Sequence, residues 1–260
     1  MSDVLLVNVI DRVATLTLHR PDSRNALSSE LSNALWDAVL AAGADGSVDV
    51  VVITGSDPAF CAGVDLKEVS GEAPSSGSFV RRRGADGLYR FLPPIDKPVI
   101  GAINGACVTG GLELALQCTF LVASERAWFA DTHGRVGILP GGGMTVLLPQ
   151  AVGLRRAIEM SLTGNRLGAE EALRLGLVNH VVPHEGLLPF AQRLAADIVS
   201  TGAVVVRRLH DQYRRVAAAG SLAEAHALEG LMAETWALDP ADVAARRSDV
   251  QARGREQGRG

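Results

Sequence analysis

The segment GAINGACVTGGLELAL, residues 101–116, carries more structural information than any other part of this sequence. Its apolar start, up to Ile103, leads into a turn that glycine interrupts. The pair Gly110-Gly111 then opens an apolar, helix-like run with Glu113 near its beginning. Glycine lets a backbone come close to a ligand, and a helix N-terminus adds positive potential at that point. Amide N–H groups next to a carboxylate favour a site where negative charge develops beside a general base.

Upstream of this segment, strand and helix patterns alternate. Residues 4–10 and 13–18 predict the two strands of a hairpin, and the β-branched run 49–54 predicts a buried strand. Between them, Ser28 is the expected N-cap of a helix whose apolar residues recur at helical spacing. A helix that connects two strands in this way predicts a parallel sheet.

Downstream, strand patterns give way to helix patterns. The further expected strands are 99–103, 119–123 and 128–130, and the further expected helices are 78–92, 112–118, 155–162, 169–175, 187–199, 204–218 and 222–238. Pro93-Pro94 ends the first of these helices, and the glycine-rich loop 137–143 precedes another helix. The residues themselves therefore predict an α/β fold with a parallel sheet and a helical C-terminal part.

The length and the charge of the chain limit its function. With 260 residues it fits one large domain, or one domain with an appendage. Its net charge of −4 argues against an extended basic surface for nucleic acid. Arg246, Arg247, Arg253, Arg255 and Arg259 make only the C-terminal tail basic, and that tail is expected to be solvated or to cover a subunit. No signal-peptide pattern and no apolar run of membrane-spanning length is visible, so a cytoplasmic protein without membrane attachment is expected.

Several site classes find no support in the sequence. Cys61, Cys107 and Cys118 are too few and too irregularly spaced for a disulfide framework or a zinc site, so buried free thiols in a reducing compartment are expected. No GxSxG elbow is found, and no GxGxxG follows the first strand. A serine peptidase and a dinucleotide-binding protein are therefore disfavoured.

Five short motifs follow one another along the chain. They are RPDSRNAL at 20–27, FCAGVDL at 60–66, the stretch from Asn104 to Ala115 that contains NG and GGLELA, GILPGGG at 137–143, and GLVNHVV at 176–182. In this order and register they resemble the crotonase family, also called the enoyl-CoA hydratase/isomerase family, over residues 4–200. The resemblance implies a repeated ββα spiral core, expected over 1–198, and a helical region, expected over 199–260, that packs in a homotrimer or a dimer of trimers.

The resemblance also implies where an acyl-CoA thioester would lie. The backbone N–H groups of Val64 and Gly110 match the oxyanion hole of the family, and Glu113 matches one of the two catalytic glutamates of its hydratases. The implied CoA-binding residues are Arg24, Ala26, Ala62, Val64, Asp65, Leu66, Lys67 and Gly110. Of these, Arg24 and Lys67 could meet phosphates as cations, or could be solvated surface charges. The resemblance implies no metal and no redox cofactor, since CoA arrives as part of the substrate.

One position departs from the pattern of the hydratases. His133 stands where the second hydratase glutamate is expected. A histidine can take or give a proton near neutral pH, and Asp131, two residues earlier, is a candidate to orient it. Both site residues also have structural interpretations: Glu113 as a first-turn glutamate that favours the helix dipole, and His133 as a histidine of a turn.

Three hypotheses therefore stay open. The first is hydration of a 2-trans-enoyl-CoA to a 3-hydroxyacyl-CoA, which Glu113 and the two oxyanion loops favour. The second is another reaction on the same enolate, namely double-bond isomerisation, decarboxylation or thioester hydrolysis, which His133 favours. The third is a non-catalytic acyl-CoA binder, in which Glu113 would be dispensable.

Overall fold

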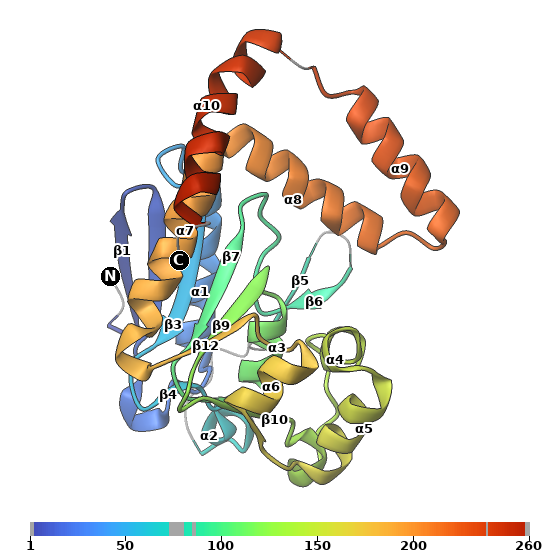
Figure 1. Cartoon of the computed structure of the whole chain (residues 1–260). Coiled ribbons are helices and arrows are strands. Elements are labelled where there is room, and N and C mark those ends of the chain that lie inside the picture. The colour runs from blue at the N-terminus through green and yellow to red at the C-terminus, as the bar shows by residue number, and fades with distance from the viewer. Residues whose placement is uncertain (1–2, 73–80, 85–86, 238, 258–260) are drawn as a thin grey trace. The chain divides into compact units, whose positions relative to one another are not determined.

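A six-stranded sheet runs through the larger part of the molecule (Figure 1). The computed structural model describes residues 3–72, 81–84, 87–237 and 239–257. The strand order is β1 (Leu5–Ile10), β2 (Val13–Leu18), β3 (Val50–Gly55), β7 (Val99–Ile103), β9 (Phe120–Ser124) and β12 (His180–Val182). The β1–β2 pair is the predicted antiparallel hairpin, and all the other neighbours are parallel, as the strand–helix–strand pattern predicts.

The predicted first helix is α1 (Ser29–Ala44). Ser28 caps it as expected, because its hydroxyl oxygen accepts a hydrogen bond from the N–H of Leu31 at 3.1 Å. At the other end, the buried ammonium of Lys97 donates to the carbonyl oxygens of Ala42 and Asp45, each at 2.6 Å. A cation at this end satisfies carbonyls that lack a partner within the helix and opposes the helix dipole.

A second sheet of four short strands carries the loops of the candidate site. Its order is β11 (Leu167–Gly168), β10 (Trp128–Ala130), β8 (Ala106–Val108) and β4 (Ala59–Cys61). The chain passes from β7 into β8 through Asn104 and Gly105 alone. The Asn104 amide fixes this crossing, because it accepts from the N–H of Gly55 and donates to the carbonyl of Ala59, both at 3.2 Å. A Cβ at position 105 would overlap the carbonyl of Pro58, so only glycine fits there.

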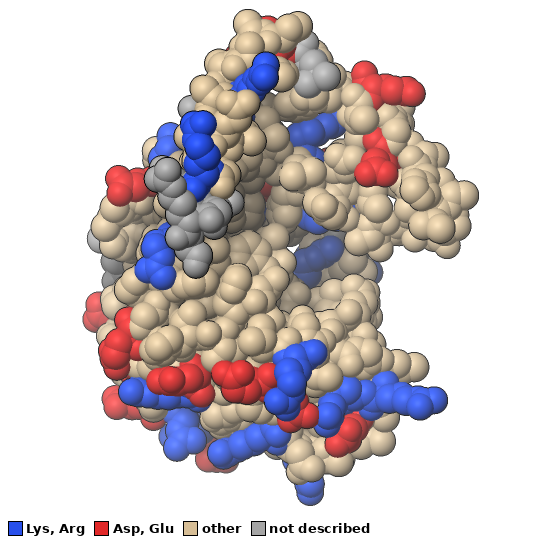
Figure 2. Space-filling view, in the orientation of Figure 1, with Lys and Arg blue, Asp and Glu red and all other residues tan. Residues whose placement is uncertain are grey.

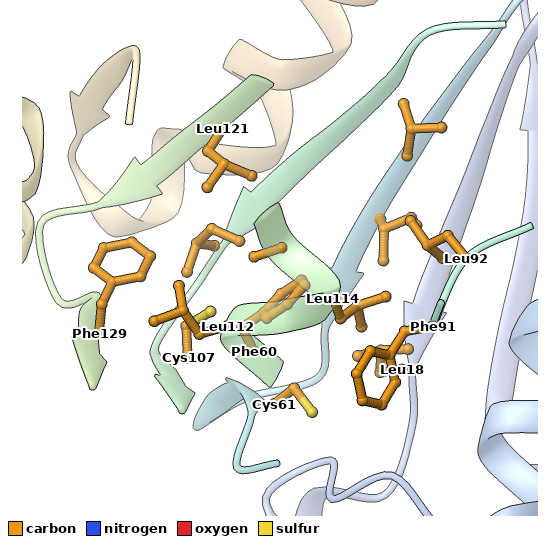
Figure 3. Close-up of a cluster of buried hydrophobic side chains, with 14 of the residues drawn as sticks. Leu18, Phe60, Cys61, Phe91, Leu92, Cys107, Leu112, Leu114, Leu121 and Phe129 are labelled. Carbon is orange, nitrogen blue, oxygen red and sulfur yellow. The ribbon is translucent and has the colours of Figure 1, made fainter. Parts of the chain in front are cut away.

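Both faces of the central sheet are buried. Along β3, Val51 and Ile53 belong to the main hydrophobic cluster, whereas Val50 and Val52 pack with Ala191 of α7 (Leu187–Thr201) on the other face. Figure 3 shows part of the main cluster, where side chains of the short central helix that follows β8 lie among residues of several strands: Leu112, Leu114, Phe60, Phe91, Cys107 and Phe129.

The predicted helix over 78–92 is wrong for the residues that the structure describes. Arg82–Arg83 (β5) and Tyr89–Arg90 (β6) form an antiparallel hairpin instead, while 78–80 and 85–86 lie outside the described residues. The turn between the two strands contains Gly87 with φ +80°, a conformation that an α-helix does not contain. The run Arg81–Arg83 resembles a solvated helix face, but the chain turns back at Gly87 to form the hairpin.

Most of the other helices agree with the sequence within a few residues. These other helices are α2 (Leu66–Val69), α3 (Gly110–Leu116), α4 (Met144–Val152), α5 (Leu154–Thr163), α6 (Ala169–Leu175), α8 (Ala203–Ala217), α9 (Leu222–Glu234) and α10 (Pro240–Gln257). Two of these, α2 and α10, were not predicted. None of the helices, over the residues described, is long and apolar enough to cross a bilayer.

The chain divides into two compact units, Met1–Arg207 and Arg208–Gly260. Within the second unit, the Arg208 guanidinium donates to the carbonyl of Met232 at 3.1 Å and to the hydroxyl of Thr235 at 2.6 Å. The face in Figure 2 carries acidic and basic side chains side by side over the lower part of the first unit, in keeping with the small net charge of −4.

Candidate active site

Two loops from different strands meet at Val64 and Gly110. A Cβ built on Gly110 would lie 3.3 Å from the Val64 nitrogen, and one on Gly63 would lie 3.5 Å from the Gly110 nitrogen. Within the part of the chain that the structure describes, neither the Val64 N–H nor the Gly110 N–H donates to another group of the protein. The structure thus brings Val64 and Gly110 together, the two residues predicted to form an oxyanion hole, and leaves both amide N–H groups without a partner among the described residues.

The Val64 N–H is aimed by the pairing of its neighbours with the RPDSRNAL segment. Leu27 donates its N–H to the carbonyl of Gly63 at 2.8 Å and accepts from the N–H of Asp65 at 3.0 Å. In this parallel bridge the polar groups of Gly63 and Asp65 face Leu27, so those of Val64 itself face the opposite side, where Gly110 lies.

An unusual backbone conformation at Thr109 sets the orientation of the Gly110 N–H. Thr109, the N-cap of α3, has φ 53° and ψ −112°, which is strained for a β-branched residue. Its N–H donates to the carbonyl of Ala130 at 2.9 Å, and its hydroxyl contacts that of Thr132. At the next position but one, a Cβ on Gly111 would overlap the carbonyl of Cys61, so glycine is needed for the two loops to approach.

Glu113 lies in the first turn of α3 and is buried, with 1% of its surface exposed. Its Oε1 accepts from the N–H of Gly142 at 2.7 Å and of Met144 at 3.2 Å, at the start of α4. One helical turn later, the Gln117 amide donates to the carbonyl of Gly142 at 2.7 Å. The glycine-rich loop therefore fixes one carboxylate oxygen of Glu113 and leaves Oε2 to face the site.

His133 faces that second oxygen. Its Nε2 lies 3.6 Å from Glu113 Oε2, and its Nδ1 lies 2.6 Å from Oδ1 of Asp131. Asp131 is fully buried; burial alone would raise its pKa, but hydrogen bonds from the His133 ring, from Ser161 and from the His133 backbone outweigh it, so the pKa is lowered. Asp131 is thus an ionised acceptor, and the expected contact with His133 is present.

Phe91 forms an apolar wall of the site. A Cβ on Gly110 would lie 3.5 Å from Cζ of its ring, and a Cβ on Gly142 would overlap the ring. The side-chain amide oxygen of Gln117, Oε1, accepts from the N–H groups of Phe91 and Leu92, each at 3.0 Å. Gln117 therefore ties this wall to the same loop that holds Glu113.

Apart from Gly110, the predicted CoA-binding residues lie on two hydrogen-bonded segments. The carbonyl of Arg24 accepts from the N–H of Ala62 at 3.0 Å, while the carbonyl of Ala26 accepts from the Arg20 guanidinium. Asp65 forms an ion pair with Arg20 at 2.9 Å and caps α2. The side chains of Arg24, Leu66 and Lys67 are exposed to solvent.

Sequence reasoning missed several residues that shape the site. They are Thr109, Gln117, Thr132 and Ser161. Only Gln117 had a signal, since it follows Glu113 by four positions and must share its face of the helix. The others act across segments that the sequence alone does not place together.

Comparisons with known proteins agree with this geometry. The enoyl-CoA hydratase/isomerase family model matches residues 9–239. A crotonyl-CoA hydratase from Syntrophomonas wolfei subsp. wolfei is 38% identical over 200 residues, which make up 76% of each chain. A crystal structure of an enoyl-CoA hydratase from Mycobacterium smegmatis is 52% identical, with a TM-score of 0.74, and covers 90% of this chain and 96% of that one.

A more distant solved structure has a different activity. It is a monofunctional enoyl-CoA isomerase from M. smegmatis, 28% identical, with a TM-score of 0.72, and the match covers 86% of this chain and 99% of that one. The residues 9–239 that the family model matches include both loops with the Val64 and Gly110 amides, and also Glu113 and His133. The chain therefore belongs to the enoyl-CoA hydratase/isomerase family.

Proposed function

We propose that this protein adds water to the double bond of a 2-trans-enoyl-CoA and forms the 3-hydroxyacyl-CoA. The observation that carries the proposal is the placement of two proton-exchanging atoms, Glu113 Oε2 and His133 Nε2, 3.6 Å apart. Both side chains are buried, and Glu113 lies three residues after Gly110, whose N–H we propose to act together with that of Val64. The relative from Syntrophomonas wolfei that carries the name crotonyl-CoA hydratase supports the same reaction.

The reaction divides between the amide pair and the Glu113–His133 pair. The Val64 and Gly110 amides hold the thioester oxygen as it gains negative charge, and each such donor contributes about 3 kcal/mol to the lowering of the barrier. Glu113 orients the water and takes its proton as the oxygen bonds to Cβ. Protonated His133 gives a proton to Cα, and transfer of the proton from Glu113 to His133 restores the pair.

The binding of CoA and the assembly of subunits extend the proposal. The CoA portion lies along Ala26, Ala62 and the segment 64–67, with Arg24 and Lys67 near its phosphates, and their exposure in the structure suits a ligand that extends into solvent. The protein is a homotrimer or a dimer of trimers, assembled through its C-terminal helices, and works in the cytoplasm.

Double-bond isomerisation is the second candidate. It needs proton transfer between two carbons and no water, and the replacement of a hydratase glutamate by His133 favours it. The solved enoyl-CoA isomerase among the similar structures supports it as well. Decarboxylation and thioester hydrolysis would use the same amide pair.

Loss of the absorbance of the conjugated thioester in crotonyl-CoA and in longer 2-enoyl-CoAs tests the proposal. We expect turnover in the wild type and a loss of about 10²–10⁴-fold in kcat for Glu113→Gln, which keeps the size of the side chain but not its basicity. Mass spectrometry of products from 3-enoyl-, malonyl- and hydroxyacyl-CoAs identifies the alternatives. Turnover of 3-enoyl-CoA alone would replace hydration by isomerisation, and tight binding without any turnover would leave a non-catalytic binder.

A further inference from the structure

We infer that Asp131 and Ser161 are positioning residues that hold His133 in one tautomer, with the proton on Nδ1 and with Nε2 as the atom that exchanges protons at the site. The inference rests on the proposed function, because it gives a role to His133 in a proton transfer. It concerns residues outside the oxyanion hole and the Glu113–His133 pair.

The geometry leaves Asp131 no freedom of orientation. Its Oδ1 accepts from Nδ1 of His133 at 2.6 Å and from the His133 backbone N–H at 3.1 Å. Its Oδ2 accepts from the hydroxyl of Ser161 at 2.5 Å. In each of these three hydrogen bonds Asp131 is the acceptor, and its side chain is 0% exposed. Because both carboxylate oxygens have a donor, the carboxylate is held in one orientation.

This arrangement decides where the imidazole proton lies. An ionised carboxylate only accepts hydrogen bonds, so neutral His133 carries its proton on Nδ1 and has its lone pair on Nε2, which faces Glu113 Oε2. When Nε2 takes a proton, the positive ring lies between two carboxylates, those of Asp131 and Glu113. A buried acid that orients a histidine and stabilises its protonated form serves the same purpose in histidine-based catalytic triads.

Ser161 completes the arrangement from another element. It lies on α5, whereas Asp131 and His133 lie at the end of β10 and the start of the 3-10 turn His133–Val136. Because its hydroxyl engages Oδ2, Asp131 keeps Oδ1 directed at the imidazole. Loss of this hydroxyl therefore weakens the tautomer preference without removing the carboxylate.

Asp131→Asn tests the inference, because the amide has nearly the same shape but can donate to Nδ1 and thereby stabilise the other tautomer. We expect kcat to fall by about 10²–10⁴-fold, with KM within about threefold, and the limb of the pH–rate profile that reports on His133 to move. Asp57→Asn is the matched control, since Asp57 Oδ2 contacts Nε2 of another histidine, His184, at 3.1 Å. That variant should keep the pH profile and should change kcat by less than about threefold.

The Ser161 variants separate positioning from simple support of the loop. Ser161→Ala should lower kcat by about tenfold, and Ser161→Thr, which keeps the hydroxyl, should restore it. If Asp131→Asn and Ser161→Ala kept both the kcat and the pH profile of an active wild type, the inference would be wrong while the proposed function stood.

Nitrogen NMR of ¹⁵N-histidine-labelled protein gives a readout that needs no substrate. The chain has six histidines, and His133→Gln identifies the signal of His133. In the neutral ring we expect Nδ1 to be protonated and Nε2 unprotonated in the wild type, and the reverse in Asp131→Asn. A wild-type ring protonated on Nε2 would overturn the inference. The expected tautomer in a protein with no turnover would instead count against the proposed function alone.

Discussion

The hydroxyl oxygens of Thr109 and Thr132 lie 2.5 Å apart, and this contact joins the loop that presents the Gly110 N–H to the loop that presents His133. The backbone N–H of Thr132 also donates to the Thr109 hydroxyl at 3.1 Å. The loop that presents the Gly110 N–H and the loop that presents His133 are therefore joined through the side chains of two threonines.

Thr109→Val should loosen this connection, because valine keeps the shape of the side chain but removes the oxygen that Thr132 needs. A polar group left without its partner costs about 1–3 kcal/mol, so the free energy of unfolding should fall by that amount in urea denaturation. The kcat should fall too. Thr109→Ser keeps the hydroxyl and is the control that should behave like the wild type in both measurements. Equal stability of the valine and serine variants would contradict the role of the contact.

Gly142 and Gly141 should differ sharply when each is changed to alanine. A Cβ on Gly142 would overlap the Phe91 ring and lie 3.0 Å from Cδ of Glu113, whereas a Cβ on Gly141 would meet only the flexible end of Arg81. Gly142→Ala should therefore lower stability by about 1–3 kcal/mol and reduce kcat, while Gly141→Ala stays near the wild type. Thermal denaturation and steady-state kinetics on the pair check this, and indistinguishable variants would contradict the described packing.

Acid denaturation should report the lowered pKa of Asp131. Burial opposes the ionised form, but hydrogen bonds from His133 and Ser161 prevail, so the pKa in the folded protein lies below its ordinary value of 3.8. A carboxyl group with a lowered pKa stabilises the folded protein when the pH is above the pKa of that group in the unfolded chain. This stabilisation is lost as the pH falls through the pKa of the group in the folded protein. The stability advantage of the wild type over Asp131→Asn should therefore be full near pH 6 and shrink below pH 4. An advantage that does not change with pH would contradict the prediction.

The cysteine thiols should be inert in the folded protein. Burial raises the pKa of Cys118 to about 12, and it does the same for Cys61, where hydrogen bonds from the backbone only partly oppose it. Thiolate is the reactive form, so a chromogenic disulfide reagent at pH 8 should label the three thiols only after denaturation. Because these pKa values are raised in the folded protein, the neutral thiols contribute fully to the free energy of unfolding below pH 9. That contribution declines as the pH rises toward 12. Cys61 and Cys107 are buried and Cys118 is half-buried, so rapid labelling of Cys61 or Cys107 in the native protein at pH 8 would contradict the prediction.

Much of the fold could be predicted from local sequence. The buried strands β2, β3 and β7 are runs of mostly apolar residues, and α1 has a capping serine and apolar residues at helical spacing. The hairpin β5–β6 does not follow, because its arginines mimic a solvated helix face. Glu113 and His133 were found through the motif register. The contacts of His133 with Ser161 through Asp131, and of Thr109 with Thr132, depend on how α5 and β10 pack, and no local pattern encodes that packing.

The contact of Gly111 with the Cys61 carbonyl has a consequence for how this scaffold acquires new reactions. With no space between the two backbones, the spacing of the amide donors is set by the meeting of β4 and β8 and cannot be tuned by exchanging side chains in either loop. Variation among reactions would then lie on the other side of the proposed site, at positions such as 91 and 133, whose side chains lie near Glu113.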